Sequence, residues 1–267
     1  MDNFLKTLTA RPNTLKTYSS LFHNWVEPFI ESRNKWDIKA VKEMANWWVN
    51  KGLAPRTVKV LVNILSKWIL HNHGIAIDTR AVVAGIMRQR QETEIKALSK
   101  LEMDSLLKET EGTDLHLLIL LASHTGMRRG EVFGLKWKDV DFLKGEITIR
   151  RSYDGPTKNG KSRIVPISKK LEEKLLAVYR VCSDNNSEDR VISKNFDPNP
   201  GLKAACRRAR IRVINFHSLR HTFASLALES GRSPRKVQQV LGHSNLSTTL
   251  NLYWSLTNDK LDLEFLE

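Results

Sequence analysis

The sequence predicts a mainly α-helical fold that includes one small antiparallel β-hairpin. Apolar residues recur at helical spacing through the first 90 residues, and helical patterns resume from Leu171 almost to the end of the 267-residue chain. Two β-branched runs, at 146–150 and 163–167, flank the turn-rich segment DGPTKNGKS, which is typical of a hairpin. The longest apolar run, Leu117 to Ala122, is far shorter than the roughly 20 residues of a membrane span. We therefore expect a small β-element inside a helical protein and no transmembrane helix.

The first 90 residues are expected to form short amphipathic helices that share a core. Aromatic and aliphatic residues follow helical spacing over 15–29. Three further helices are expected, one from Asp37 to Gly52, one from Pro55 to Gly74 and a weaker one after Asp78. Their apolar faces indicate packing rather than a binding site.

A polar connection divides the chain. Residues 88–96 (RQRQETEIK) contain a single apolar side chain, and Ser99 with Glu102 then forms a capping box that opens the next helix. We expect residues 1–90 to be one helical domain, 91–97 a linker, and 98–267 a second domain that contains the hairpin.

Both domains carry an excess of positive charge. The chain has 43 Lys+Arg and 29 Asp+Glu, a net charge of +14 with a pI near 9.8. Residues 1–97 contribute 15 − 8 = +7 and residues 98–267 contribute 28 − 21 = +7. Solubility alone can account for a high pI, but an excess on every domain favours a protein that surrounds a nucleic acid.

The cysteine content indicates a reducing compartment. Cys182 and Cys206 are too few for a disulfide framework, and their spacing does not fit a structural zinc site. Residues 1–10 lack the apolar core of a signal peptide. We expect a cytoplasmic protein.

Two segments place polar side chains together on helices. In HTGMRRGEVFGLKW, Arg128 and Glu131 are three residues apart and share a helical face, although a surface ion pair has the same spacing. In NFHSLRHTFASLALES, helical geometry groups His217, Arg220 and His221 opposite an apolar stripe that includes Leu219. The alternative is that the two histidines are exposed to solvent and have no function. A metalloprotease-like metal site is disfavoured because serine follows the first histidine where that site has glutamate.

The segment KVQQVLGHSNLSTTLNLYWSL adds His243 at a helix corner and Tyr253 ten residues later. A single tyrosine most often packs in a core with one hydrogen bond. The combination of motifs is more informative. TGMRRGE, TKNGKSRIVPI, HSLRH, LGHSNLSTT and Tyr253, in this order and spacing, resemble the tyrosine recombinases, the phage-integrase and Xer-type family of site-specific DNA recombinases.

The resemblance implies a role for each matching residue. Arg128 and Arg220 match the arginines that clamp the scissile phosphate, His217 and His243 the residues that hydrogen-bond its oxygens, Lys158 the lysine of the hairpin, and Tyr253 the nucleophile. Glu131 matches an acidic position that supports the first arginine. Arg129 and His221 flank the motifs, and we expect them to be structural or to contact the backbone.

The implied chemistry needs no metal or cofactor. Two guanidiniums can bind the charged nonbridging oxygens bidentately, and Lys158 can protonate the departing 5′-hydroxyl as general acid. The implied partner is double-stranded DNA that carries specific recombination sites. The implied assembly is a monomer in solution and a homotetramer on synapsed DNA, which exchanges strands through a Holliday junction to integrate, excise or resolve DNA elements. The expected location is the cytoplasm, in the bacterial nucleoid, in an archaeal cell or in a phage-infected host.

Residues 1–90 resemble the family's helical core-binding (SAM-like) domain more loosely, and 98–267 its catalytic domain, which implies a simple two-domain recombinase. One departure is Tyr-Trp-Ser-Leu after the expected nucleophile, where the family often has a small residue and then histidine. Two alternatives remain open. One is DNA relaxation of the type IB topoisomerase kind, and the other is a non-catalytic DNA-binding protein with the same fold.

Overall fold

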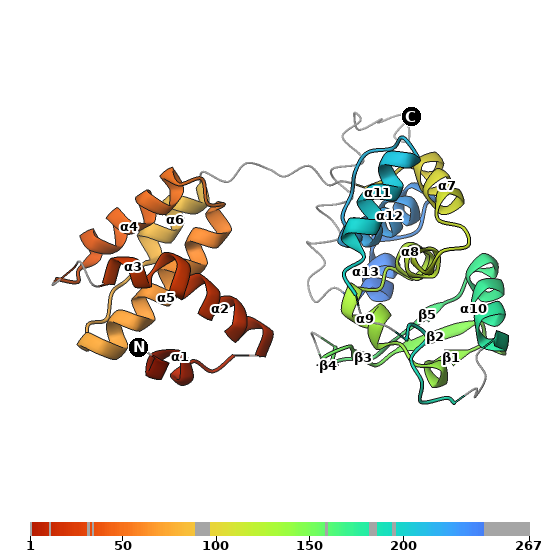
Figure 1. Cartoon of the computed structure of the whole chain (residues 1–267), viewed down its shortest axis with the longest axis horizontal. Coiled ribbons are helices and arrows are strands. Elements are labelled where there is room, and N and C mark those ends of the chain that lie inside the picture. The colour runs from red at the N-terminus through yellow and green to blue at the C-terminus, as the bar shows by residue number, and fades with distance from the viewer. Residues whose placement is uncertain are drawn as a thin grey trace, which may run out of the picture. The chain divides into compact units, whose positions relative to one another are not determined.

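The computed structural model describes residues 2–10, 12–30, 33, 35–88, 97–157, 160–181, 186–193 and 196–242. The chain folds as two compact units, Met1–Thr93 and Glu94–Glu267 (Figure 1). Each unit has its own hydrophobic core. None of the helices in the described ranges is long and apolar enough to cross a membrane.

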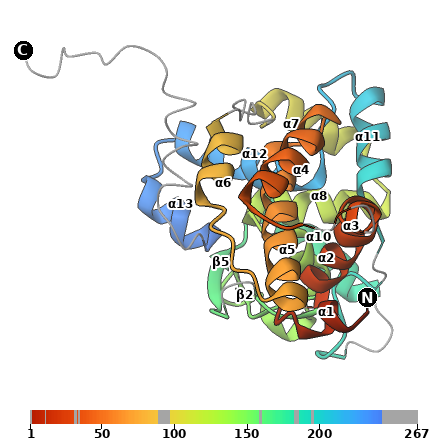
Figure 2. The same ribbon diagram turned by 90° about the vertical axis from the view of Figure 1, so that its left-hand side faces the viewer.

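The regular elements of the N-terminal unit in its described part are all helices. Its elements are α1 (Asp2–Thr7), α2 (Pro12–Trp25), α3 (Glu27–Ile30), α4 (Ile38–Asn50), α5 (Pro55–His73) and α6 (Arg80–Arg88). Helix α5 runs through the middle of the unit and packs against α2, α4 and α6 (Figures 1 and 2). Phe22 and Trp48 are fully buried in this core, and Trp48 Nε1 donates to Trp25 O at 3.0 Å. The apolar stripes therefore form a core, as the sequence predicts.

The expected helix ends are present in this unit. The Asp37 side chain accepts from Ala40 N at 2.8 Å and caps α4. Helix α5 begins with Pro55, whose missing N–H costs nothing in the first turn, and ends at Gly74 in the left-handed conformation. Local side-chain chemistry thus sets where these helices start and stop.

The C-terminal unit surrounds a buried helix. It contains α7 (Lys100–Glu109), α8 (Asp114–Thr125), α9 (Arg129–Gly134), the 3₁₀ helix η1 (Trp137–Asp139), α10 (Lys169–Val181), α11 (Asn199–Arg208), α12 (Phe216–Glu229) and α13 (Pro234–Leu241). Residues 117–122 of α8 are all buried, and α12 packs along this helix (Figure 1). The Ser99–Glu102 capping box opens α7, as the sequence predicts.

The unit also holds two small antiparallel sheets. Strands β1 (Val140–Asp141), β2 (Glu146–Ile149) and β5 (Arg163–Pro166) form a three-stranded sheet in the order β1-β2-β5. The expected pairing of β2 with β5 is present, with Ile149 opposite Arg163. The segment between them is more than a turn, because β3 (Arg151–Ser152) pairs with β4 (Gly155–Pro156) as a separate ribbon. That ribbon packs against α9, where a Cβ on Gly134 would lie 2.6 Å from the Ser152 carbonyl carbon.

Candidate active site

The C-terminal turn of α13 gathers three arginines. Gly242 ends the helix in the left-handed conformation, with φ of 64°. Three guanidiniums donate to the last three carbonyls: Arg163 Nε to Val240 O (2.7 Å), Arg220 Nη2 to Leu241 O (2.7 Å) and Arg128 Nη2 to Gly242 O (3.4 Å). The last carbonyls of a helix lack helical partners and form the negative end of its dipole. This turn therefore holds three cations from separate elements close together.

Arg220 is the most buried of the three, at 3% exposed. It lies in α12, which begins after the Asn215 cap, and its Nη1 also donates to Gly126 O at 2.6 Å. Burial, and then the charge of Arg128, lowers the pKa of Arg220 to about 9, so the side chain still carries its proton at neutral pH. The expectation that Arg220 projects away from the core is wrong, because α8 and α13 cover that side of α12.

A glycine lets these helices approach. Gly126 ends α8 with φ of 65°, and a Cβ there would lie 2.5 Å from Leu241 Cδ2 and 2.7 Å from Phe223 Cδ1. Real Cβ contacts are longer, and the left-handed conformation itself disfavours a side chain. Gly126 therefore brings the end of α8 to α12 and α13, where its carbonyl meets Arg220.

A buried carboxylate joins two of the arginines. The Glu131 side chain is 2% exposed and accepts four hydrogen bonds, two on each oxygen. The donors are Arg128 N (2.8 Å) and Nη1 (2.9 Å), and Arg163 Nη1 (3.0 Å) and Nη2 (2.6 Å). Burial alone would raise the pKa of Glu131, but the bonds and charges of Arg163 and then Arg128 hold it below its ordinary value. Glu131 is thus an anion inside a cationic cluster.

Sequence reasoning missed Arg163, although a signal for it exists. In RIVP, Ile164 is 58% exposed and Val165 is 1% exposed, so alternation along β5 puts Arg163 on the buried face with Val165. An arginine at an inward position of a strand needs a buried acceptor. Its partner, Glu131, is expected from the sequence to support Arg128, and nothing in the spacing of the two residues links Glu131 to Arg163.

The two histidines of α12 lie together at its N-terminal end. His217 is exposed, and its ring packs against that of His221 edge to face, with centroids 4.9 Å apart. Burial, and then the charge of Arg220, lowers the pKa of His221. Within the described ranges, no group of three or more His, Cys, Asp or Glu side chains could hold a metal ion.

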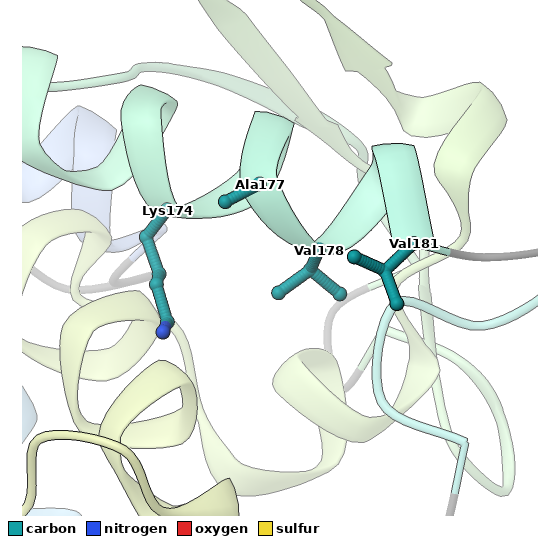
Figure 3. A pocket seen from close by; sticks show the side chains of 4 residues that line it. All are labelled: Lys174, Ala177, Val178 and Val181. Carbon is teal, nitrogen blue, oxygen red and sulfur yellow. The ribbon is translucent and has the colours of Figure 1, made fainter.

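Lys158, His243 and Tyr253 lie outside the described residues, so the roles expected for them stay predictions. Arg129, one of the flanking residues, lies at the start of α9 and donates through Nη2 to Phe196 O at 3.0 Å. A separate open hollow of about 410 Å³ lies on α10, lined by Lys174, Ala177, Val178 and Val181 (Figure 3). None of the arginines of the cluster lines it.

Comparison with known proteins shows similarity to recombinases and integrases in both sequence and fold. The chain is 27% identical to the tyrosine recombinase XerA of Saccharolobus solfataricus, over 99% of this chain and 90% of that one. The fold is similar to that of the Tn1549 transposon integrase in complex with a circular intermediate DNA (TM-score 0.73, 16% identity, 94% and 92% of the two chains). It is also similar to a lambda integrase in a tetramer bound to a Holliday junction (TM-score 0.70, 19% identity, 99% and 79%).

The match to a family covers most of the C-terminal unit. Residues 92–260, which include the arginine cluster, match the phage integrase family. The chain therefore belongs to the phage integrase family and is a tyrosine recombinase, an enzyme that transfers DNA strands.

Proposed function

We propose that this chain is a site-specific DNA recombinase that cuts and rejoins duplex DNA through a 3′-phosphotyrosine intermediate. The observation that carries the proposal is the arginine cluster. Arg128 and Arg220 donate to adjacent carbonyls of one helical turn, so their guanidiniums are close enough to serve one phosphate. In the sequence, that turn leads directly into His243.

Arg128 is the arginine best placed to receive the phosphate. Its side chain is 26% exposed, compared with 10% for Arg163. Its bond to Gly242 O, at 3.4 Å, is the longest of the three bonds to the turn. A charged phosphate oxygen is a stronger acceptor than a carbonyl, and it therefore displaces Gly242 O from the guanidinium. Arg220 supplies a second cation on the same side, and His217 and His243 hydrogen-bond the phosphate oxygens.

The reaction is a reversible transesterification. The Oη of Tyr253 forms a bond to phosphorus, and the bond from phosphorus to the 5′-oxygen breaks. Attack releases the phenolic proton to His217 or through the phosphate environment, because a phenol with a pKa of about 10 is a weak nucleophile. Lys158 gives a proton to the departing 5′-oxygen. The phosphotyrosine bond keeps the energy of the broken linkage, so rejoining needs no nucleotide.

The assembly follows from the same chemistry. Strand exchange between two duplexes requires four cuts, and a homotetramer on synapsed sites, formed from monomers in solution, provides four nucleophiles. The fold similarity to lambda integrase supports this arrangement. We assign residues 1–90 to DNA binding as the core-binding domain and 98–267 to catalysis. This activity places the protein with the cell's DNA, in the cytoplasm.

A covalent-adduct assay tests the nucleophile. The labelled DNA spans the region that flanks the coding sequence, and the adduct is mapped to its position. We expect Tyr253→Phe to bind this DNA and form no adduct. The control Tyr179→Phe removes the same hydroxyl from a side chain that packs against Trp137 in the core, and it should form the adduct. An adduct with Tyr253→Phe, or none with the wild type, contradicts the proposal.

The role of Lys158 has its own test. DNA with sulfur at the 5′-bridging position of the scissile phosphate has a leaving group that needs no proton. Lys158→Ala should cleave this DNA near the wild-type rate and the ordinary duplex far more slowly. An equal loss on both duplexes rules out the general-acid role.

Product analysis separates recombination from relaxation. Two copies of the mapped site on one plasmid should yield deletion or inversion products. Relaxation of plasmids that lack the site, without such products, favours the type IB topoisomerase alternative instead.

A further inference from the structure

The third arginine of the cluster has no role in the reaction proposed above. We propose that Arg163 is a positioning residue of strand transfer, which fixes the guanidinium of Arg128 through Glu131. This inference rests on the proposed function. It adds a residue of β5 to the machinery that stabilises charge on the scissile phosphate.

All three nitrogens of the Arg163 guanidinium are engaged within the protein. Nη1 and Nη2 donate to the two oxygens of Glu131, at 3.0 and 2.6 Å, and Nε donates to Val240 O at 2.7 Å. The side chain is only 10% exposed. A planar fork held at three points has little freedom to turn towards a substrate. Arg163 is therefore suited to fix the position of a neighbouring side chain and not to bind substrate.

That neighbour is Glu131, and through it Arg128. Glu131 Oε1 accepts from Arg163 Nη1 and from Arg128 Nη1, so one oxygen bridges the two guanidiniums. Without Arg163, half of the four hydrogen bonds that fix the carboxylate are lost. The carboxylate can then rotate, and the Arg128 guanidinium is no longer held in one position by its bond to Glu131. A displacement of about 1 Å at a catalytic group can cost roughly 100-fold in rate.

The end of α13 anchors Arg163 in turn. A Cβ on Gly242 would lie 3.1 Å from Arg163 Cδ and 3.3 Å from its Nη1, so this turn lies directly against the arginine. Arg163 also sits in β5, opposite Ile149 of β2. It thus fixes Arg128 relative to a strand on one side and a helix end on the other.

A second arginine provides a matched control. Arg151, in the β3–β4 ribbon, pairs through Nη1 with the buried carboxylate of Asp139. Asp139 has no bond to Arg128, Arg163 or Arg220 among the hydrogen bonds described. Arg151→Ala therefore breaks a pair of the same chemistry that does not lead to the cluster.

The test is a double-variant cycle on the duplex where the wild type forms its adduct. We expect Arg163→Ala to slow adduct formation by about 100-fold in the wild-type background. It should cause little further loss in an Arg128→Ala background, because the residue through which it acts is gone. Arg151→Ala should cause equal, small losses in both backgrounds. An equal loss for Arg163→Ala in both backgrounds overturns the inference and leaves the proposed function standing, whereas a wild type without an adduct overturns both.

A second DNA substrate lacks the negative charge on the scissile phosphate that Arg128 is proposed to bind. A methylphosphonate at the scissile position has a methyl group in place of one nonbridging oxygen and is neutral. Arg163→Ala and Arg128→Ala should both lose far less on this duplex than on the phosphodiester. If Arg163→Ala fails to fold, judged by circular dichroism, Arg163→Lys takes its place, because lysine keeps the charge but not the fork. A loss for the variant of equal size on both duplexes overturns the inference.

Discussion

Glu131 and Asp139 are two buried carboxylates with similar settings and different connections. Each side chain is 2% exposed, and each accepts from the backbone N–H three residues earlier, of Arg128 or of Lys136. Each also pairs with an arginine on a strand, Arg163 or Arg151. The C-terminal unit thus uses the same device twice.

The two carboxylates differ in how completely they are bonded and in what lies beyond them. Glu131 has two bonds on each oxygen, whereas Asp139 Oδ1 has no hydrogen bond within the described residues and lies 3.5 Å from Arg150 Nε. Arg150 is 58% exposed, so water can replace Asp139 as its partner. The arginines of Glu131 continue to the end of α13. The same pair chemistry therefore ends at arginines that reach solvent in one place and continues into the arginine cluster in the other.

The largest effect is expected from Glu131→Ala. The change leaves Arg163, which is only 10% exposed, without the anion that holds two of its nitrogens, and removing one partner of a buried pair costs about 3–5 kcal/mol. Urea unfolding monitored by tryptophan fluorescence measures this loss. A loss below about 1 kcal/mol would mean that the ion pairs of Glu131 contribute no more to stability than solvent-exposed ones. The proposed difference between Glu131 and Asp139 would then be wrong.

A pair of glycines compares a tightly packed turn beside the arginine cluster with an open turn of the sheet. Gly126, beside Arg220, and Gly145, between β1 and β2, have nearly equal φ of 65° and 63°. Only a Cβ at Gly126 meets other atoms within 4 Å. Gly145→Ala should cost about 1–2 kcal/mol for the left-handed conformation. Gly126→Ala should cost about 1–3 kcal/mol more, because Leu241 and Phe223 must move. Equal losses in urea unfolding would show that α13 packs loosely on α8.

Much of the fold can be predicted from the sequence because its signals are local. Proline, glycine and short polar side chains mark the ends of α4, α5 and α7, and alternation with β-branched residues marks β2 and β5. The ribbon of β3 and β4 was not expected. It packs on α9 through close contact at Gly134, and contact between distant segments leaves no local pattern.

The part of the site that depends on short sequence spacing was predictable. Arg128 and Glu131 are three residues apart, and the structure pairs them at 2.9 Å. Arg220 was placed on an exposed face because a helical wheel shows which residues share a side but not what covers that side. Arg163 was missed because its partner lies 32 positions away in the chain. The family resemblance identifies Arg128, Glu131 and Arg220 as site residues, but only the tertiary contacts show how the three arginines come together.

Asp139→Ala should have a smaller effect than Glu131→Ala. Both arginines near Asp139 reach solvent and can be hydrated once the carboxylate is gone, so we expect a loss of about 1–3 kcal/mol. Adduct formation by the folded variant should stay close to the wild-type rate, because Asp139 does not contact the cluster arginines within the described residues. A selective loss of rate at full folding would place Asp139 in the same network as Glu131.

The smallest effect concerns the pH dependence of stability. The pKa of Glu131 in the folded protein lies below the ordinary value of 4.5, so the unfolded chain takes up this proton more readily. The contribution of Glu131 is therefore complete above pH 4.5 and is lost as the pH falls through the lower, folded pKa. Each unit of pKa shift corresponds to about 1.4 kcal/mol. The wild type carries this dependence on top of its other carboxylates, and a variant is needed to isolate it.

Glu131→Gln provides that isolation, because it keeps the shape of the side chain and cannot titrate. The difference in unfolding free energy between the wild type and Glu131→Gln should be constant from pH 7 to about pH 5 and should narrow below pH 4.5. The matched variant Asp139→Asn is the control for removing a buried carboxylate outside the cluster. Its difference in unfolding free energy from the wild type is measured over the same pH range. A difference for Glu131→Gln that stays constant to pH 3 would mean that Arg163 and Arg128 do not hold Glu131 as an anion. The cluster would then lack the negative charge that allows three guanidiniums to lie so close together.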